Sequence, residues 1–231
     1  MPDKSDIWVE KRHVGQILPA RISGVTDQPP EWGMTVDDVV TFRSGEPRDC
    51  SDIAILADAA SRRITSWLWG QSASPGQSWV EYGRNRVLTA TTAAIFHENW
   101  QMVQIDGQLA GGCFGFLIPD PYDPGDLSDV PDFVRPLITM EEVAKGCWML
   151  QCIAVFPEQR GKGLGRRLID MACKTAQTSG ARRIVLEVEN VNAGAIGLYT
   201  ASGFTEWMRC PYVPFPGSDD TGDWILMVRD L

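Results

Sequence analysis

The chain holds 231 residues, 44% of them hydrophobic, and its 21 basic and 30 acidic side chains give a formal net charge of −9. That length fits one domain with an elaborated N-terminal part better than two full domains. Nucleic acid is disfavoured as a partner, because a basic face supplies most of the affinity for it. The acidity suits a cationic substrate such as an amine, and it is equally well explained by solubility.

Three features of the sequence indicate whether the protein binds a metal and where in the cell it lies. They are the cysteines, the acidic loop and the start of the chain. Six cysteines and two histidines occur, with no Cys-x-x-Cys pair, so zinc-ligand spacing is absent. The aspartate-rich stretch 119–130 does not match the EF-hand pattern of an invariant glycine with a terminal glutamate. No stretch approaches the roughly 20 apolar residues of a membrane span, and the first residues have no apolar secretion core. We expect reduced thiols, no metal, no membrane partner and a cytoplasmic location.

The first part of the chain predicts an arm, a strand and three helical stretches. Residues 1–37 combine prolines and glycines with little periodicity, which indicates an extended arm packed on the domain or part of a dimer contact. Val39–Arg43 reads as a strand from its β-branched content. Apolar residues at helical spacing then occupy 53–60, behind capping residues at 48–52, and helical stretches follow at 61–70 and 78 to about 94. Three tryptophans on these helices either pack in the core or line a groove: Trp67, Trp69 and Trp79.

The middle of the chain predicts a β-hairpin followed by one helix. Trp100–Ile105 and Leu109–Ile118 read as strands, and Asp106-Gly107 between them is a two-residue hairpin turn. Beyond the aspartate-rich loop, residues 131–144 carry apolar side chains at helical spacing. Two carboxylates lie near the end of that helix: Glu141 and Glu142.

A strand, a glycine turn and a helix come next and give the clearest ligand signal. Cys147–Phe156 is apolar and β-branched, residues 164–179 are amphipathic, and glycines occupy 161, 163 and 165 in the turn between them. Glycine permits positive φ and a close approach of the backbone to a ligand. The free amides at a helix start favour an anion. We therefore predict a phosphate-bearing ligand at the start of this helix.

The spacing of these glycines fits neither common nucleotide loop. The dinucleotide fingerprint needs Gly-x-Gly-x-x-Gly, whereas the turn reads Gly-x-Gly-x-Gly. No Gly-x-x-x-x-Gly-Lys-Ser/Thr run occurs. The rest of the chain predicts a strand at 183–189, a short helix at 192–202, and two last strands at 204–212 and 223–229.

Two of these stretches together resemble the signatures of the GNAT superfamily of N-acetyltransferases. The run Arg-Gly-Lys-Gly-Leu-Gly at 160–165 resembles the family's R/Q-x-x-G-x-G/A loop. Residues 192–204 resemble its second signature, N-x-x-A-x-x-L-Y-x-x-x-G-F, and match it at every fixed position: Asn192, Ala195, Leu198, Tyr199, Gly203 and Phe204. The resemblance implies an α/β (α+β) GNAT fold over residues 38–231, with a mixed central sheet of about 6–7 strands flanked by helices, behind the arm 1–37.

The resemblance also implies how the chain holds acetyl-CoA as a co-substrate. Main-chain amides of 160–166 grip the pyrophosphate, and the pantetheine arm pairs with the exposed edge of the central strand at 153–155. An amide near Ile153 contacts the acetyl oxygen. Asn192 contacts the coenzyme and is equally well explained as a helix N-cap. The residues implied in coenzyme binding are Ile153, Ala154, Val155, Arg160, Gly161, Lys162, Gly163, Leu164, Gly165, Arg166, Asn192 and Tyr199.

The resemblance implies a general acid and a general base, and only the general acid has a matching residue in this sequence. Tyr199 stands where the family places its general acid, near the coenzyme sulfur. A free thiol titrates near pH ~8.5 and a tyrosine near ~10, so proton donation to a thiolate needs a tuned site. Many relatives carry a glutamate base on the central strand, but residues 148–151 hold no carboxylate.

The identity of the general base is therefore open among Glu142, Glu141 and a water chain. Glu187 and Glu189 alternate on a strand, which indicates a solvent-facing or structural role. Poorer candidates for the base are His97, Glu98 and Asp106.

The leading hypothesis is an acetyl-CoA-dependent N-acetyltransferase that acts on a small-molecule or protein amine. One alternative is a non-catalytic acyl-CoA-binding regulatory module, and another is a nucleotide-binding protein that uses the same loop. Dimers are common in the family, so a homodimer is an expectation. The acceptor and the role of residues 1–37 are not specified by the sequence.

Overall fold

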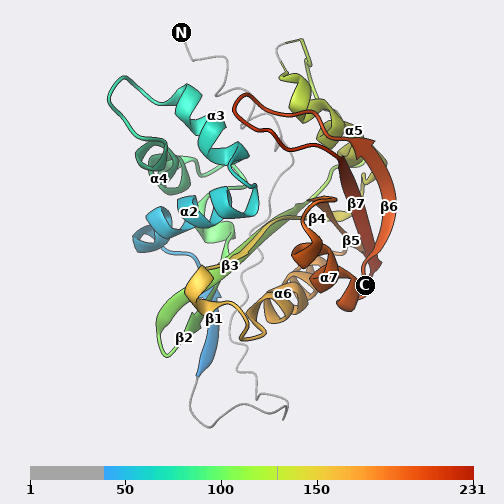
Figure 1. Cartoon of the computed structure of the whole chain (residues 1–231). Coiled ribbons are helices and arrows are strands. Elements are labelled where there is room, and N and C mark those ends of the chain that lie inside the picture. The colour runs from blue at the N-terminus through green and yellow to red at the C-terminus, as the bar shows by residue number, and fades with distance from the viewer. Residues whose placement is uncertain (1–38, 129) are drawn as a thin grey trace.

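The computed structural model describes residues 39–128 and 130–231, so the predicted arm at 1–37 lies outside the described residues. One mixed sheet organises this part of the chain (Figure 1), with seven strands in the order β1-β2-β3-β4-β5-β7-β6. Helices α2, α3 and α4 cover one face, and α6 and α7 cover the other. This architecture confirms the predicted fold class.

The first three strands form an antiparallel edge of the sheet. They are β1 (Val40–Ser44), β2 (Gln101–Ile105) and β3 (Gln108–Leu117). Asp106 and Gly107 turn the β2–β3 hairpin with φ values of 50° and 77°, and this pair of positive angles is what a two-residue turn requires. The hairpin prediction is confirmed.

Helices α2 (Cys50–Ala60), α3 (Ile64–Ser72) and α4 (Trp79–Thr89) follow β1 in the chain. Ser78 and Glu81 form a capping box that fixes the start of α4. This helix ends at Thr89, earlier than the predicted limit near 94. The segment beyond it turns into the core instead, where Ala93 and Ala94 are buried.

The central elements are α5 (Arg135–Val143), β4 (Trp148–Val155), α6 (Leu164–Thr178) and β5 (Arg183–Glu189). β4 runs antiparallel to β3 and parallel to β5. The chain ends with α7 (Ala193–Ala201), β6 (Thr205–Pro211) and β7 (Asp223–Asp230). Four short 3-10 helices complete the described elements: Pro47–Asp49, His97–Asn99, Asp132–Val134 and Pro157–Gln159.

The loop between β6 and β7 reaches back between α3 and α5 (Figure 1). Phe215 in this loop anchors it, with ring centroids 6.3 Å from Trp67 of α3 and 6.0 Å from Phe133. These contacts pack the loop against α3 and the 3-10 helix at Asp132–Val134.

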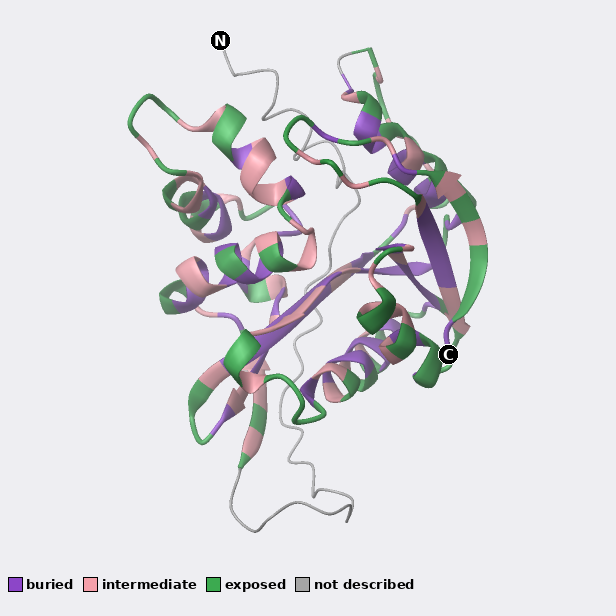
Figure 2. Ribbon diagram, viewed as in Figure 1, coloured by how far each residue is buried: buried purple, intermediate pink, exposed green. Residues whose placement is uncertain are grey.

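Buried residues line the sheet and the helix sides that face it (Figure 2), and they form one apolar cluster on each face of the sheet. One cluster joins the sheet to α2–α5 and includes Ile53, Phe114 and Met149. The other joins it to α6 and α7 and includes Leu168 and Phe204. Among the described residues, no helix is long and apolar enough to cross a membrane.

A buried ion pair fixes β1 to the start of α2. Arg43 donates two hydrogen bonds to Asp49, at 2.6 and 2.9 Å, and the Glu46 amide donates a third at 2.8 Å. Burial alone raises the pKa of Asp49, but these hydrogen bonds outweigh it and the net pKa is lowered. The pair therefore contributes stability above the unfolded-state pKa of Asp49. That contribution is lost as the pH falls through the lowered folded-state pKa.

We expect Arg43→Ala to lower the free energy of unfolding by about 3 kcal/mol, because it leaves the Asp49 carboxylate buried without its cation. The matched control is Arg48→Ala, whose pair with Glu46 is solvent-exposed, so its cost stays below about 1 kcal/mol. Urea denaturation at pH 7 measures both. Equal losses in the two variants would contradict this interpretation.

Candidate active site

Strands β4 and β5 part from one another halfway along the sheet. Their pairing consists of Trp148 with Ile184 and Met149 with Val185. Beyond Met149 no described strand pairs with β4 on its β5 side, and residues 153–155 are only half-buried. Unpaired strand edges accept an extended ligand by main-chain hydrogen bonding. The opening lies at the position where the sequence predicts pantetheine pairing.

A β-bulge sits at the same point. On the β3 side, Phe114 pairs with Cys152 while the next residue, Gly115, pairs with Leu150, so Gln151 is the extra residue. A Cβ on Gly115 would lie 2.1 Å from the Met149 carbonyl oxygen, so only glycine fits opposite the bulge. A bulge re-aims side chains, and here consecutive residues of β4 reach one cavity.

The glycine turn leads from β4 into α6. Gly161 and Gly163 have φ values of 78° and 74°, which glycine adopts readily. A Cβ at either position would meet nothing within 4 Å, so the space above the turn is open. No side chain caps α6 at Gly163, and the first amides of a helix have no acceptor within it. The anion site expected at this turn stays a prediction.

The charged residues of the turn are exposed and lie around this opening. Arg160 Nε donates to the Val155 carbonyl at 3.2 Å, and Lys162 Nζ donates to Gln159 at 2.8 Å. Arg166 donates to the Ala201 carbonyl at 2.6 Å and so links α6 to the end of α7. Leu164 is buried beneath the turn. A Cβ on Gly165 would meet Leu198 of α7 at 2.9 Å, which indicates close helix packing there.

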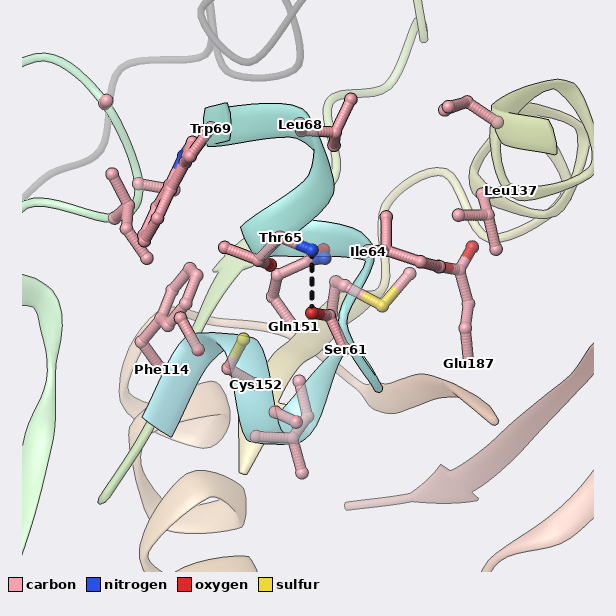
Figure 3. Close-up of a pocket in the computed structure, with 18 of the residues that line it drawn as sticks. Ser61, Ile64, Thr65, Leu68, Trp69, Phe114, Leu137, Gln151, Cys152 and Glu187 are labelled. Carbon is pink, nitrogen blue, oxygen red and sulfur yellow. Dashed lines mark hydrogen bonds between the residues drawn. The ribbon is translucent and has the colours of Figure 1, made fainter. Parts of the chain in front are cut away.

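A cavity of about 180 Å³ opens on the α2–α3 side of the place where the strands part. Its walls are mainly apolar and include Ile64, Leu68, Trp69, Phe114, Leu137 and Trp224. Gln151 and Cys152 of β4 and Glu187 of β5 enter it from the sheet. Figure 3 shows Gln151 beneath Thr65 and the Glu187 carboxylate turned toward Leu137. Glu187 is the only carboxylate among the described residues that line this cavity.

Tyr199 lies on the α6–α7 side of the sheet, packed against Phe204. Burial raises its pKa to about 12, with a smaller contribution from the Cys152 thiol. Because Cys152 also lines the cavity, Tyr199 and the cavity flank the same part of β4. The hydroxyl is protonated at neutral pH, as a proton donor must be.

The sequence model of the acetyltransferase (GNAT) family matches residues 62–204, more than half of the chain. The chain belongs to the GNAT acetyltransferase family. The match spans the parted strands, the glycine turn and most of the residues that line the cavity, so these features belong to the GNAT core of this protein.

Several relatives are similar over part of their length. The chain is 38% identical over 80 residues to the ribosomal protein bS18-alanine N-acetyltransferase of Escherichia coli K12, covering 34% of this chain and 53% of that protein. It is 47% identical over 55 residues to the streptothricin acetyltransferase of Streptomyces lavendulae, covering 24% of this chain and 29% of that protein. Each match covers less than two thirds of the relative.

Solved structures support the fold. An N-acetyltransferase from Staphylococcus aureus Mu50 superposes with a TM-score of 0.59 at 16% identity, covering 82% of this chain and all of that one (100%). A further acetyltransferase crystal structure gives a TM-score of 0.58 at 18% identity, covering 82% of this chain and 98% of the other. At these identities the likeness concerns the fold alone.

Within this GNAT core, the structure separates the predicted base candidates from the cavity. Glu142 is exposed on α5, and Glu141 is buried and accepts a 2.6 Å hydrogen bond from Tyr122. Neither is among the cavity-lining residues. His97 is buried beside the Gly45 carbonyl, and Asp106 lies in the hairpin turn.

Asn192 is the N-cap of α7. Its Oδ1 accepts from the Ala195 amide at 3.3 Å, and the residue is half-buried. The N-cap interpretation of Asn192 is confirmed, and its coenzyme contact stays a prediction.

The two glutamates of β5 have different surroundings. Glu189 is 4% exposed and forms an ion pair with Arg62 at 2.6 Å, while Arg62 also reaches Asp220 at 3.1 Å. This is a structural role, as the sequence indicates. Glu187 instead lines the cavity. The available signal was its position on the strand directly before the second GNAT signature.

Proposed function

We propose that this protein is an acetyl-CoA-dependent N-acetyltransferase that acetylates a primary amine. The observation that supports this most is the position of the Glu187 carboxylate, inside an apolar cavity at the point where β4 and β5 part. A coenzyme lying along the parted edge and an amine in the cavity would meet there. The GNAT family membership supplies the reaction class.

The described residues fit acetyl-CoA at both of its ends. The open glycine turn and uncapped start of α6 suit the diphosphate, and positive charge from Arg160 and Lys162 lies beside them. The half-buried edge at 153–155, which no described strand pairs on its β5 side, suits the amide-bearing pantetheine arm. When bound, acetyl-CoA supplies the thioester that the amine nitrogen attacks, with a C–N bond formed and the C–S bond broken.

Glu187 is our proposed general base. An ammonium cannot attack a carbonyl until it loses a proton, and Glu187 is the cavity carboxylate able to accept one. Glu142, one of the base candidates from the sequence, is exposed outside the cavity, so any action of it requires intervening water. Tyr199 is our proposed general acid. It donates a proton to the departing thiolate, while an amide near Ile153 donates to the acetyl oxygen.

Two measurements on the wild-type protein test the proposal. Acetyl-CoA is expected to raise Tm in thermal-shift titrations where ATP and NAD do not, because a ligand stabilises the state that binds it. Thiol release is then followed in the presence of acetyl-CoA and a panel of primary amines. Binding without thiol release for any amine would favour the regulatory-module alternative, and stabilisation by NAD alone would end the coenzyme assignment.

We expect Gly163→Asp to weaken acetyl-CoA binding at least tenfold, about 1.4 kcal/mol, because it places a carboxylate beside the diphosphate. Gly180→Asp at the other end of α6 is the matched control. Both glycines have positive φ, 74° and 83°, and open space for a Cβ, and aspartate tolerates this region better than most residues. Isothermal titration calorimetry measures both. Equal weakening by the two substitutions would show that binding does not involve the turn.

A further inference from the structure

The turn between α2 and α3 contains two consecutive residues in a disfavoured backbone conformation. Arg62 and Arg63 have φ values of 48° and 78°. Left-handed backbone is strained for side chains such as arginine. Such strain persists only where surrounding contacts hold it, and it is frequent at functional sites. Contacts of this turn must therefore offset its strain.

Arg62 joins three segments that are far apart in the sequence. Its Nε atom lies 2.6 Å from the Glu189 carboxylate at the end of β5, and its Nη2 atom lies 3.1 Å from Asp220 in the β6–β7 loop. Glu189 is 4% exposed, and burial raises its pKa while Arg62 acts against this shift. A buried carboxylate depends on such a cation. The side chain of Arg63, in contrast, is exposed.

Residues on both sides of this turn line the cavity (Figure 3). Ser61 precedes the two arginines, Ile64 follows them, and both are in the cavity wall. Glu187, two residues before Glu189 on β5, is in the wall as well. Arg62 lies just behind it. It therefore connects the first turn of α3 to the strand that forms part of the sheet side of the cavity.

The β6–β7 loop contacts α3 at a second point. The ring centroids of Phe215 and Trp67 are 6.3 Å apart. Between this contact and Asp220, the Ser218 amide donates to the Phe215 carbonyl at 2.9 Å, and the Asp220 amide donates to the Ser218 hydroxyl at 3.2 Å. The loop therefore braces α3 by one aromatic and one ionic contact, and Arg62 supplies the ionic one.

We propose that Arg62 is a positioning residue of the acetyl transfer, which holds the first turn of α3 in the cavity wall by pairing with Glu189 and Asp220. This step rests on the proposed function, in which the amine binds in the cavity. Without Arg62 the two carboxylates lose the cation between them, and the strained turn relaxes. The amine then binds more weakly. The glycine turn at 160–166 leads into α6 on the other face of the sheet, so coenzyme binding is unaffected.

Steady-state thiol release tests the role with n-butylamine, 2-phenylethylamine and spermidine as acceptors. Arg62→Met is expected to raise KM about tenfold for each amine that the wild-type protein acetylates, with kcat changed less than about threefold. Arg62→Lys should recover part of the loss, because it restores a cation without the forked guanidinium. Arg63→Met is the matched control and should leave KM unchanged. An unchanged KM in Arg62→Met, or an equal rise in Arg63→Met, would overturn the proposal.

Asp220→Asn tests whether the loop takes part. Asp220 and Arg62 act through one ion pair, so the double variant Arg62→Met/Asp220→Asn should have the KM of Arg62→Met alone. A KM that multiplies the effects of the two single substitutions would contradict a brace that acts through Arg62.

Hydrogen exchange followed by mass spectrometry separates this role from the proposed function. In Arg62→Met, peptides covering residues 61–72 and 212–222 should exchange about tenfold faster, while those of α6 keep their rates. Faster exchange throughout the protein would indicate general destabilisation and contradict the proposal. No thiol release with any amine in the wild-type protein would defeat the proposed function. Unchanged exchange in Arg62→Met would defeat this inference alone.

Discussion

Glu187→Gln is expected to lower kcat/KM for the amine about a hundredfold at pH 7, a loss of about 2.7 kcal/mol in transition-state stabilisation. The amide keeps the shape of the carboxylate in the cavity wall but cannot accept the proton of the ammonium. The loss should shrink as the pH rises toward ~10, where alkylamines lose that proton to solvent. Steady-state thiol release between pH 7 and pH 10 measures the effect.

Glu142→Gln and Glu141→Gln are the matched controls, because both carboxylates lie on α5 outside the cavity wall. We expect Glu142→Gln to retain activity within about twofold. If Glu142→Gln rather than Glu187→Gln produced the pH-dependent loss, Glu142 would be the base and our assignment of Glu187 would be wrong. A pH-independent loss in Glu187→Gln would indicate a packing role for that residue.

Tyr199→Phe is expected to lower kcat about a hundredfold, since general acid catalysis commonly contributes a factor of about 10² or more. The ring stays packed on Phe204, and only the hydroxyl is removed. Acetyl-CoA affinity should change little, which separates this loss from a binding defect. Tyr82→Phe on α4 is the control, because Tyr82 lies outside the cavity wall.

The pH profile of the wild-type protein tests the same residue independently. Burial raises the pKa of Tyr199 to about 12, so its proton is retained well above the usual tyrosine range. A proton donor is lost only as the pH passes its pKa. Activity should therefore show no falling limb from this group below about pH 11. A falling limb centred near pH 10 that disappears in Tyr199→Phe would contradict a buried acid.

Local sequence signals predict most elements of this fold because each strand and helix has its own periodicity and boundary residues. The strand at 183–189 has the predicted bounds, and Asp106-Gly107 forms the predicted hairpin turn. The predicted end of α4 is too late in the chain. Ala93 and Ala94 are compatible with a helix, but in the structure they are buried in the turns that follow it. The small side chain of alanine is compatible with both a helix and a buried turn, so the sequence does not distinguish them.

The region where β4 and β5 part was harder to predict from the sequence, because its geometry depends on which strands pair across the sheet. β7 inserts between β5 and β6, so β5 is an interior strand and α3 and α5 lie over the Glu187 face. The alternation of apolar and polar residues along β5 alone predicts that such a carboxylate faces solvent. The bulge at Gln151 is likewise a product of register with β3 and leaves no local pattern in the sequence.

A crystal structure of the protein with acetyl-CoA and a primary amine that it acetylates tests the central claim most directly. We predict the diphosphate on the amides of residues 160–166, the sulfur beside Tyr199, and the amine nitrogen within hydrogen-bonding distance of Glu187. A coenzyme bound elsewhere, or an amine whose nitrogen points away from Glu187, would contradict this account.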